Sequence, residues 1–287
     1  MRLILAVGLV LCAFAANSVL NRLALAGGAI GPGAFAAVRL GSGALALGSL
    51  VALRGRRAGT PGWARLWGAG WLLVYMLGFS YAYVTLPAGI GALILFGTVQ
   101  LTMFAGAVIG GQDVPGRRWA GVAIAFAGLT GFLWPLGGLA VGPDPAGAAL
   151  MAVAGLGWGV YSLAGRSEAD PLAATAGNFL LAAPVAVGLA LLHPDAQAVS
   201  AVGLGYGVVA GVITSGLGYA LWYRVLPQIP ATAAAVAQLL VPILAALGGA
   251  LLLGEVPSAR LLVTGAVVLG GVAFSLTHPA GGKARRG

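Results

Sequence analysis

The sequence is a succession of long apolar runs separated by short breaks that contain proline, glycine or charged residues. A helix that crosses a bilayer needs about 20 mostly apolar residues to span about 30 Å of hydrocarbon. Ten runs of about this length can be delimited, with approximate ends. They lie near 3–24, 33–53, 66–84, 88–110, 118–135, 147–165, 171–192, 201–221, 229–252 and 260–278. We therefore predict an all-α membrane protein with ten transmembrane helices.

The composition favours lipid over water as the solvent of this chain. Hydrophobic residues make up 60% of it and charged residues only 7%, against about 25% in a soluble domain. Such a chain has too few polar groups to cover a water-facing surface, which excludes a soluble enzyme. Disorder requires low hydrophobicity and high charge, so it is excluded as well. The single cysteine, Cys12, excludes a disulfide framework and a cysteine-rich metal site, and no cofactor is expected.

The positions of the basic residues predict the orientation of the chain. Lys and Arg collect on the cytoplasmic side of membrane proteins. With the N-terminus inside, the cytoplasmic ends and loops hold most of the 15 basic residues, namely Arg2, Arg54, Arg56, Arg57, Arg65, Arg117, Arg118, Arg166, Arg224, Lys283, Arg285 and Arg286. The exceptions are Arg22, Arg39 and Arg260. We therefore expect both termini in the cytoplasm. Because orientation in a membrane explains the basic residues behind the net charge of +9, no nucleic acid partner is expected.

The two halves of the sequence match when one is shifted by about 142 residues. Matching pairs are Gly106 and Gly248, Asp113 and Glu255, Gly128 and Gly270 and, with a slightly different offset, Ser18 and Ser162 and Arg22 and Arg166. Each half holds five spans, and an odd number of crossings inserts the second copy upside down. We predict a first repeat over 1–140, a second, inverted repeat over 146–279 and a basic cytoplasmic tail over 280–287. Inverted repeats are typical of secondary transporters, whose substrate site lies at the midplane between the halves.

Three stretches carry a resemblance to a known family. They are 82–129, 218–227, and 241–243 together with 253–255 and Gly265. On these stretches the sequence resembles bacterial EamA-type transporters of the drug/metabolite transporter superfamily. The resemblance implies ten helices in two inverted five-helix repeats around a central cavity. It also implies a place in the inner membrane of a bacterium, and transport, often outward, of amino acids, nucleotide-related compounds, amines or drugs. The first half departs from the pattern, since Gln100 stands where Pro242 stands in the second half and Asp113 replaces the usual Glu.

Polar or amphipathic side chains inside the predicted spans are candidates for a substrate site. Polar groups within a membrane are costly, so they usually face a cavity or a partner helix. The candidates are Asn17, Arg39, Gln100, Trp158, Tyr161, Tyr219 and Gln238. Gln100 either lines a cavity or bonds another helix. The proline at 242 frees the carbonyl of Gln238 for binding or only kinks the helix.

The remaining candidates also leave alternatives open. Arg39 either extends to the interface, holds a substrate carboxylate or bonds a helix end. The aromatic residues either stack on a substrate or belong to the core and the interfacial belt.

The functional prediction follows from what the spans contain and what they lack. No predicted span interior holds a carboxylate or a histidine, and the sequence shows no nucleophile–base pair, metal cluster or phosphate loop. We therefore expect no enzyme activity and no conventional proton relay, with Asp113 and Glu255 at helix ends as the weak points of that expectation. Transport would then proceed by facilitated diffusion or substrate exchange, and the cell's own metabolite gradient would drive export.

The sequence favours a secondary transporter that exports small metabolites, such as amino acids or related compounds, by alternating access around a central cavity. The alternative is a membrane-embedded protein without transport activity, either a lipid-handling enzyme or an assembly scaffold. The expected partners are a small-molecule substrate and the lipid bilayer, and a homodimer is left open.

Overall fold

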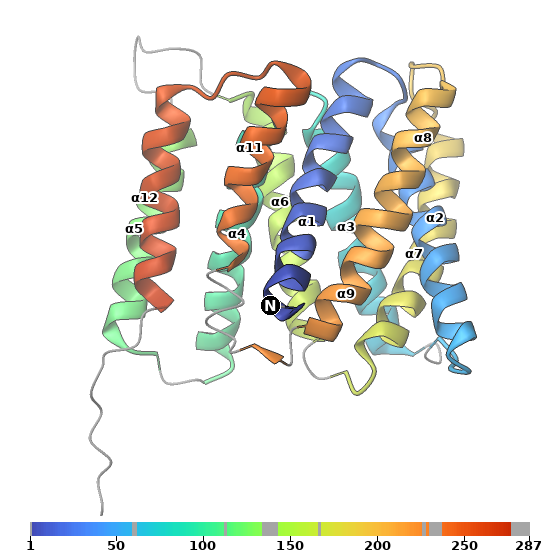
Figure 1. The fold of residues 1–287 in the computed structure, drawn as a ribbon, viewed down its shortest axis with the longest axis horizontal. Helices are drawn as coiled ribbons and strands as arrows, with labels where there is room; N and C mark the ends of the chain where they lie inside the picture. Colours follow the sequence, from blue (N-terminus) through green and yellow to red (C-terminus); the bar gives the residue numbers. More distant parts are fainter. Residues whose placement is uncertain are drawn as a thin grey trace, which may run out of the picture.

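The chain folds into a bundle of helices that run up and down in alternation (Figure 1). The computed structural model describes residues 2–58, 62–111, 114–133, 143–165, 168–225, 228–229 and 237–276. The first-half helices are α1 (Arg2–Ala26), α2 (Pro32–Leu53), α3 (Trp63–Ala82), α4 (Ala88–Ile109) and α5 (Gly116–Leu133). The second-half helices are α6 (Pro145–Gly165), α7 (Pro171–Leu192), α8 (Ala201–Val209), the π-helix η1 (Ala210–Leu217), α9 (Gly218–Val225), α11 (Leu240–Leu253) and α12 (Ala259–Leu276).

The predicted spans coincide with these helices. The 171–192 span is α7, and the 33–53 span begins one residue after α2 does. The 201–221 span corresponds to α8, η1 and α9, which follow one another without a break and form one column. The 229–252 span ends one residue before α11 does, but 230–236 lie outside the described residues. Every element with described bounds is helical, so the all-α prediction is confirmed.

Six of these helical columns are long and apolar enough to cross a membrane. They are α1, α2, α4, α6, α7 and the column that begins with α8. α11 and α12 are shorter apolar helices, and α3 and α5 carry arginines in their first turns. Large apolar side chains face outward around the bundle, among them Leu45, Leu251 and Val263. A soluble monomer rarely exposes so many large apolar side chains, so this outer surface of the bundle faces lipid.

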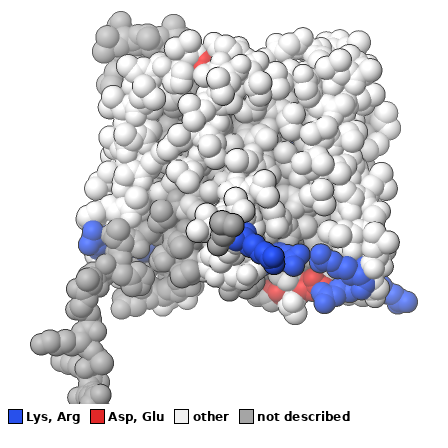
Figure 2. Space-filling view, viewed as in Figure 1, with Lys and Arg blue, Asp and Glu red and all other residues white. Residues whose placement is uncertain are grey.

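Basic side chains gather at one end of the bundle (Figure 2). We call this the basic end and define it by Arg54, Arg56, Arg65, Arg117 and Arg118, which lie at the end of α2 or the starts of α3 and α5. Two ion pairs lie there, Arg56 Nη1 to Asp170 Oδ2 at 2.6 Å and Arg65 Nη1 to Glu168 Oε1 at 3.2 Å.

Asp170 also caps α7, because its carboxylate accepts a hydrogen bond from the Ala173 amide. Partial burial acts to raise the pKa of the Asp170 carboxyl, but the Ala173 amide and the Arg56 guanidinium outweigh it and hold that pKa below its usual value. The Asp170 carboxylate is therefore charged at neutral pH, and its negative charge stabilises the N-terminus of α7.

Glycines let neighbouring helices approach until their backbones meet. In α5, a methyl group on Gly121 would lie 2.6 Å from the Ser275 amide nitrogen of α12. In α12, one on Gly271 would lie 2.8 Å from the Gly121 carbonyl oxygen. Close approach over small residues is how membrane helices gain packing without a hydrophobic driving force. Close packing over Gly43 and Gly211 likewise brings α2 against η1. This contact positions the site described next.

Candidate functional site

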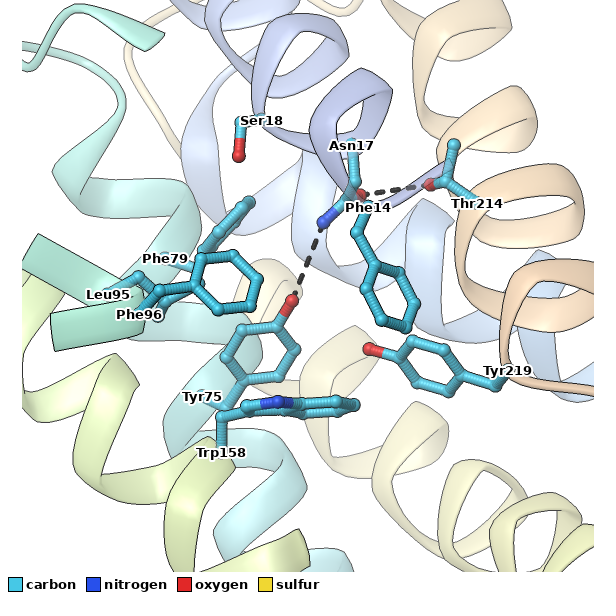
Figure 3. A pocket seen from close by; sticks show the side chains of 10 residues that line it. All are labelled: Phe14, Asn17, Ser18, Tyr75, Phe79, Leu95, Phe96, Trp158, Thr214 and Tyr219. Atoms are coloured by element: carbon cyan, nitrogen blue, oxygen red, sulfur yellow. Dashed lines mark hydrogen bonds between the residues drawn. The ribbon is translucent and has the colours of Figure 1, made fainter. Parts of the chain in front are cut away.

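A small cavity lined mostly by buried side chains lies near the middle of the bundle, where helices of both halves meet. Figure 3 shows its lining. α1, α3 and α4 contribute Phe14, Asn17, Ser18, Tyr75, Phe79, Leu95 and Phe96, and the second half contributes Trp158, Thr214 and Tyr219. Its volume is about 20 Å³, which is room for roughly one water molecule. In this conformation the cavity therefore has room for no more than a water-sized group.

Aromatic rings form most of the cavity wall. Trp158 lies 5.0 Å from both the Tyr75 and the Tyr219 ring, centroid to centroid, and Phe14 meets Tyr219 edge-on at 6.0 Å. Such contacts contribute about 0.5–1.5 kcal/mol each beyond the area they bury. The wall therefore offers ring faces to a flat or apolar ligand.

A chain of hydrogen bonds runs along the other side of the cavity. The Thr214 hydroxyl donates to Asn17 Oδ1 at 3.0 Å, and Asn17 Nδ2 donates to the Tyr75 hydroxyl at 3.5 Å (Figure 3). Arg39 Nη2 donates to the same Tyr75 oxygen at 3.1 Å, and Arg39 Nε donates to Ser215 Oγ at 3.1 Å. Four helices, α1, α2, α3 and η1, are thereby joined through one polar network.

The π-helix explains why two successive residues serve this network. Thr214 bonds Asn17 of α1 and Ser215 bonds Arg39 of α2, although both lie on η1. π-helical turns are rare and are frequently found at functional sites. Both side chains are buried, at 3% and 0% exposure, so the distortion turns them inward together.

Arg39 is fully buried beside the cavity, and it does not reach the interface as one of the sequence alternatives proposed. Its guanidinium lies over the rings of Tyr75 and Phe79, with the carbon centre 5.5 and 5.1 Å from their centroids. Its Nη1 has no hydrogen-bond partner. Within the described part of the chain, no carboxylate pairs with it. A buried cation thus stands directly behind the cavity wall.

A larger pocket opens at the basic end, between the start of α3, the end of α6 and the start of α7. Its volume is about 240 Å³, and its lining includes Trp67, Tyr161, Glu168, Thr175 and Asn178. The Tyr161 hydroxyl donates to Thr175 Oγ1 at 3.3 Å, and the Tyr161 ring lies 5.6 Å from that of Trp158. Trp158 and Tyr161 therefore stand between this pocket and the central cavity.

A third pocket, of about 270 Å³, lies at the opposite end of the bundle. Its acidic groups cap helices, since Asp195 accepts from the Ala34 amide of α2 and Asp144 accepts from the Gly147 amide of α6.

Near this end, Arg22 and Glu255 form what we call the Arg22–Glu255 latch. Arg22 Nε meets Glu255 Oε1 at 2.8 Å, and both side chains are 17% exposed. Arg22 also donates to the Tyr83 and Val84 carbonyls beyond the end of α3. Glu255 Oε2 accepts from the Ala88 amide at the start of α4, at 2.7 Å. The latch thus ties α1, α3 and α4 of the first half to the segment between α11 and α12.

The structure brings some of the sequence candidates together and separates others. Asn17, Trp158 and Tyr219 line the central cavity, while Arg39 and Tyr161 contact residues of its wall. Gln100 instead lines a small separate pocket between α4, α5 and α12. Gln238 lies half-buried just before α11 and is not part of the central lining. Asp113, one of the two acids singled out in the sequence, lies outside the described residues.

Sequence reasoning missed the apolar part of the wall. Phe14, Phe79, Leu95 and Phe96 line the cavity, but an apolar residue in an apolar span carries no sign of which way it faces. One signal was present: Phe14 lies three and four residues before Asn17 and Ser18, which puts all three on one helical face.

Fold and cavity together define a helical, multi-pass membrane protein with an internal chamber between its halves. The EamA-like transporter family model matches residues 145–277. The chain is 46% identical over 286 residues to the uncharacterized protein PA1977 of Pseudomonas aeruginosa, an alignment that covers 100% of this chain and 98% of that protein. The chain belongs to the EamA-like transporter family, which places it among membrane transporters.

A solved crystal structure has the same fold. It superposes with a TM-score of 0.66 over 93% of this chain and 98% of its own, at 21% sequence identity. At that identity the likeness concerns the fold alone.

Proposed function

We propose that the protein is a secondary transporter that exports small metabolites, such as amino acids or related compounds, by alternating access. One observation carries the proposal: a small cavity with polar and aromatic walls lies between the two halves, with a larger pocket toward each end of the bundle. Alternating access requires a central site that opens to one side at a time. The chamber, its Trp158–Tyr161 barrier and the Arg22–Glu255 latch suit that cycle.

The packing of the helices supports an inverted repeat of five helices in each half. Under that pairing α1 corresponds to α6, and α3 to the column of α8, η1 and α9. The structure packs α6 against α3 and α4, and it packs α1 against that column and α11. The pairs α2–α7, α4–α11 and α5–α12, whose members correspond to one another, also pack together. This is the pattern that a pseudo-two-fold axis in the membrane plane would produce.

Ten crossings with both termini in the cytoplasm follow from the same proposal. The basic end would then be the cytoplasmic end. In a Cys12→Ala background, a cysteine at Ala58 should be protected from an impermeant thiol reagent in intact cells. A cysteine at Ala196, in the exposed loop after α7, should be labelled. Labelling at position 58 with protection at 196 would reverse the orientation.

The described acids support a cycle that is driven by substrate gradients. Asp144, Glu168, Asp170, Asp195 and Glu255 all lie outside the described helices, at their ends or in the segments between them. Among the described residues, no carboxylate within a span could therefore change the equilibrium between inward-open and outward-open states when it is protonated. A pH step imposed on proteoliposomes should drive no uphill accumulation of substrate. Accumulation that Glu255→Gln or Asp113→Asn abolishes would contradict this.

Trp158→Ala should reduce substrate exchange in proteoliposomes about tenfold or more. Trp158 contacts Tyr75, Tyr161 and Tyr219, and losing three aromatic contacts of about 0.5–1.5 kcal/mol each weakens both the wall and the barrier. Trp119→Ala is the matched control, because Trp119 is 52% exposed on α5 and lies outside the central lining. The substrates for the assay come from comparing the metabolites in the medium of expressing and non-expressing cells. Equal flux in the two variants would remove Trp158 from the transport path.

A further inference from the structure

We propose that the central cavity receives the negatively charged group of an organic monoanion, such as a carboxylate on an aromatic or apolar body, and that Arg39 supplies the opposing charge. This proposal rests on the transport function proposed above and names the class of its substrate. The first observation is the lack of a partner for the Arg39 charge. Arg39 is 0% exposed, its Nη1 makes no hydrogen bond, and no carboxylate of the described residues pairs with it. A buried, unpaired cation is costly, and charged residues within spans usually mark a substrate pathway.

The acids in the described part of the chain are engaged elsewhere. Glu255 binds Arg22 and the Ala88 amide, Asp195 and Asp144 cap helices, and Glu168 and Asp170 pair with arginines at the basic end. The Tyr75 and Phe79 rings and the Ser215 hydroxyl stabilise the guanidinium without cancelling its charge. The positive potential therefore extends through the wall into the cavity.

Tyr75 carries this potential to the ligand side. Its hydroxyl oxygen accepts from both Arg39 Nη2 and Asn17 Nδ2, so its single proton is left to donate to a further acceptor. Tyr75 itself lines the cavity, and the Tyr219 hydroxyl points into the same space (Figure 3). A charge-assisted bond to an anionic oxygen is about twice as strong as a neutral one.

The rest of the lining selects the body of the ligand and excludes a cation. The lining residues include no acid, so an ammonium group would meet the Arg39 charge with nothing to oppose it. Phe14, Phe96, Trp158 and Tyr219 present rings that suit a flat apolar group. Because the cavity holds only about 20 Å³ in this conformation, the ligand enters when the wall moves apart. The pocket of about 240 Å³ at the basic end adjoins the cavity across Trp158 and Tyr161.

Three compounds with one body and different charges test the proposal. The probes are 3-phenylpropionate, 3-phenylpropanamide and 3-phenylpropylamine, titrated calorimetrically into the purified full-length protein in lipid nanodiscs. We expect the anion to bind at least about tenfold more tightly than the amide, and the amine to bind most weakly. Equal binding of the three, a preference for the amine, or no binding of the anion would each overturn the proposal.

Variants show whether Arg39 is the source of the preference. Arg39→Gln should reduce the affinity for the anion to that for the amide, and Arg39→Lys should keep part of the preference. Tyr75→Phe keeps the charge and removes the donor, so it should weaken anion binding several-fold with little change for the amide. This variant also serves if Arg39→Gln does not fold. Arg65→Gln, at the basic end, should leave all three affinities unchanged. An anion preference that survives both Arg39→Gln and Tyr75→Phe would overturn the assignment.

Counterflow in proteoliposomes separates this proposal from the transport function on which it rests. Exchange of the amide or the amine, but not of the anion, would leave transport standing and refute the anion site. Binding of the anion without exchange of any of the three would leave the site standing and count against transport.

Discussion

Gly211→Ala should lower the apparent melting temperature of the purified protein and abolish substrate exchange, whereas Gly205→Ala should do neither. Both glycines lie on the column formed by α8, η1 and α9. A methyl group on Gly211 would overlap Ser42 Oγ and the Arg39 carbonyl oxygen, and would lie 3.0 Å from the Gly43 amide nitrogen. Because two of these obstacles are backbone atoms, no change of rotamer relieves the overlap.

The expected size of the effect follows from overpacking. An added carbon in a packed interior typically costs about 1–3 kcal/mol. Here it also pushes η1 away from α2, and with it Ser215 from Arg39 and Thr214 from Asn17, so function is lost beyond the loss in stability. At Gly205 nothing lies within 4 Å of the added methyl, and alanine in place of glycine favours a helix by about 0.5–1 kcal/mol.

Heating followed by size-exclusion chromatography measures the stability, and exchange in proteoliposomes measures the function. A Gly211→Ala protein as stable and as active as the Gly205→Ala protein would show that η1 does not need its close contact with α2.

Glu255→Gln and Arg22→Gln should each open the end of the bundle opposite the basic end, which faces outward in the proposed orientation. The rate at which a buried cysteine there is labelled should rise about tenfold or more. The latch joins Arg22 to Glu255, to the carbonyls beyond α3 and, through Glu255, to the start of α4. Hydrogen bonds to charged groups contribute about 1.5–3 kcal/mol each. A change of 1.4 kcal/mol between two states alters their ratio about tenfold, so loss of the latch shifts the population toward the open state.

Leu86→Cys, in a Cys12→Ala background, reports this opening. Leu86 is 0% exposed and lies between the segments that the latch holds. An impermeant thiol reagent applied to intact cells should label it slowly in the presence of the latch and faster in either latch variant. Arg65→Gln breaks an ion pair at the basic end and is the matched control, with no expected rise in labelling. Unchanged rates in both latch variants would make the ion pair a packing feature alone.

The sequence repeat adds a further expectation to the latch. Arg22 matches Arg166 and Glu255 matches Asp113 in the sequence, so the proposed inverted repeat would place the same pair of charges at the other membrane face. If the pair serves as a latch at both faces, Asp113→Asn should not raise labelling of Leu86→Cys from outside. A rise equal to that of Glu255→Gln would count against separate latches.

The candidate site was only partly predictable from the sequence, and the particular residues show why. Asn17, Trp158 and Tyr219 stood out as polar or amphipathic side chains in apolar spans, and all three line the cavity. Gln100 stood out for the same reason but lies in a pocket between α4, α5 and α12. Composition marks a side chain as costly in lipid, but the rotation of each helix about its axis decides which neighbour satisfies it. For Arg39 the sequence left three alternatives, and burial removed the one that placed it at the interface.

By itself the sequence determined the helical architecture, because the bilayer requires every crossing segment to satisfy its own backbone and to be apolar over about 20 residues. Both requirements are local, so runs such as 171–192 predict their helix almost to the residue. Only the tertiary structure decided which side chains meet. Arg39 and Tyr75 are 36 residues apart, and Asn17 and Thr214 are 197 apart. Their contacts depend on the glycine-mediated approach of α2 to η1 and on the π-helical turn, both of which arise from packing between helices and not from any single span.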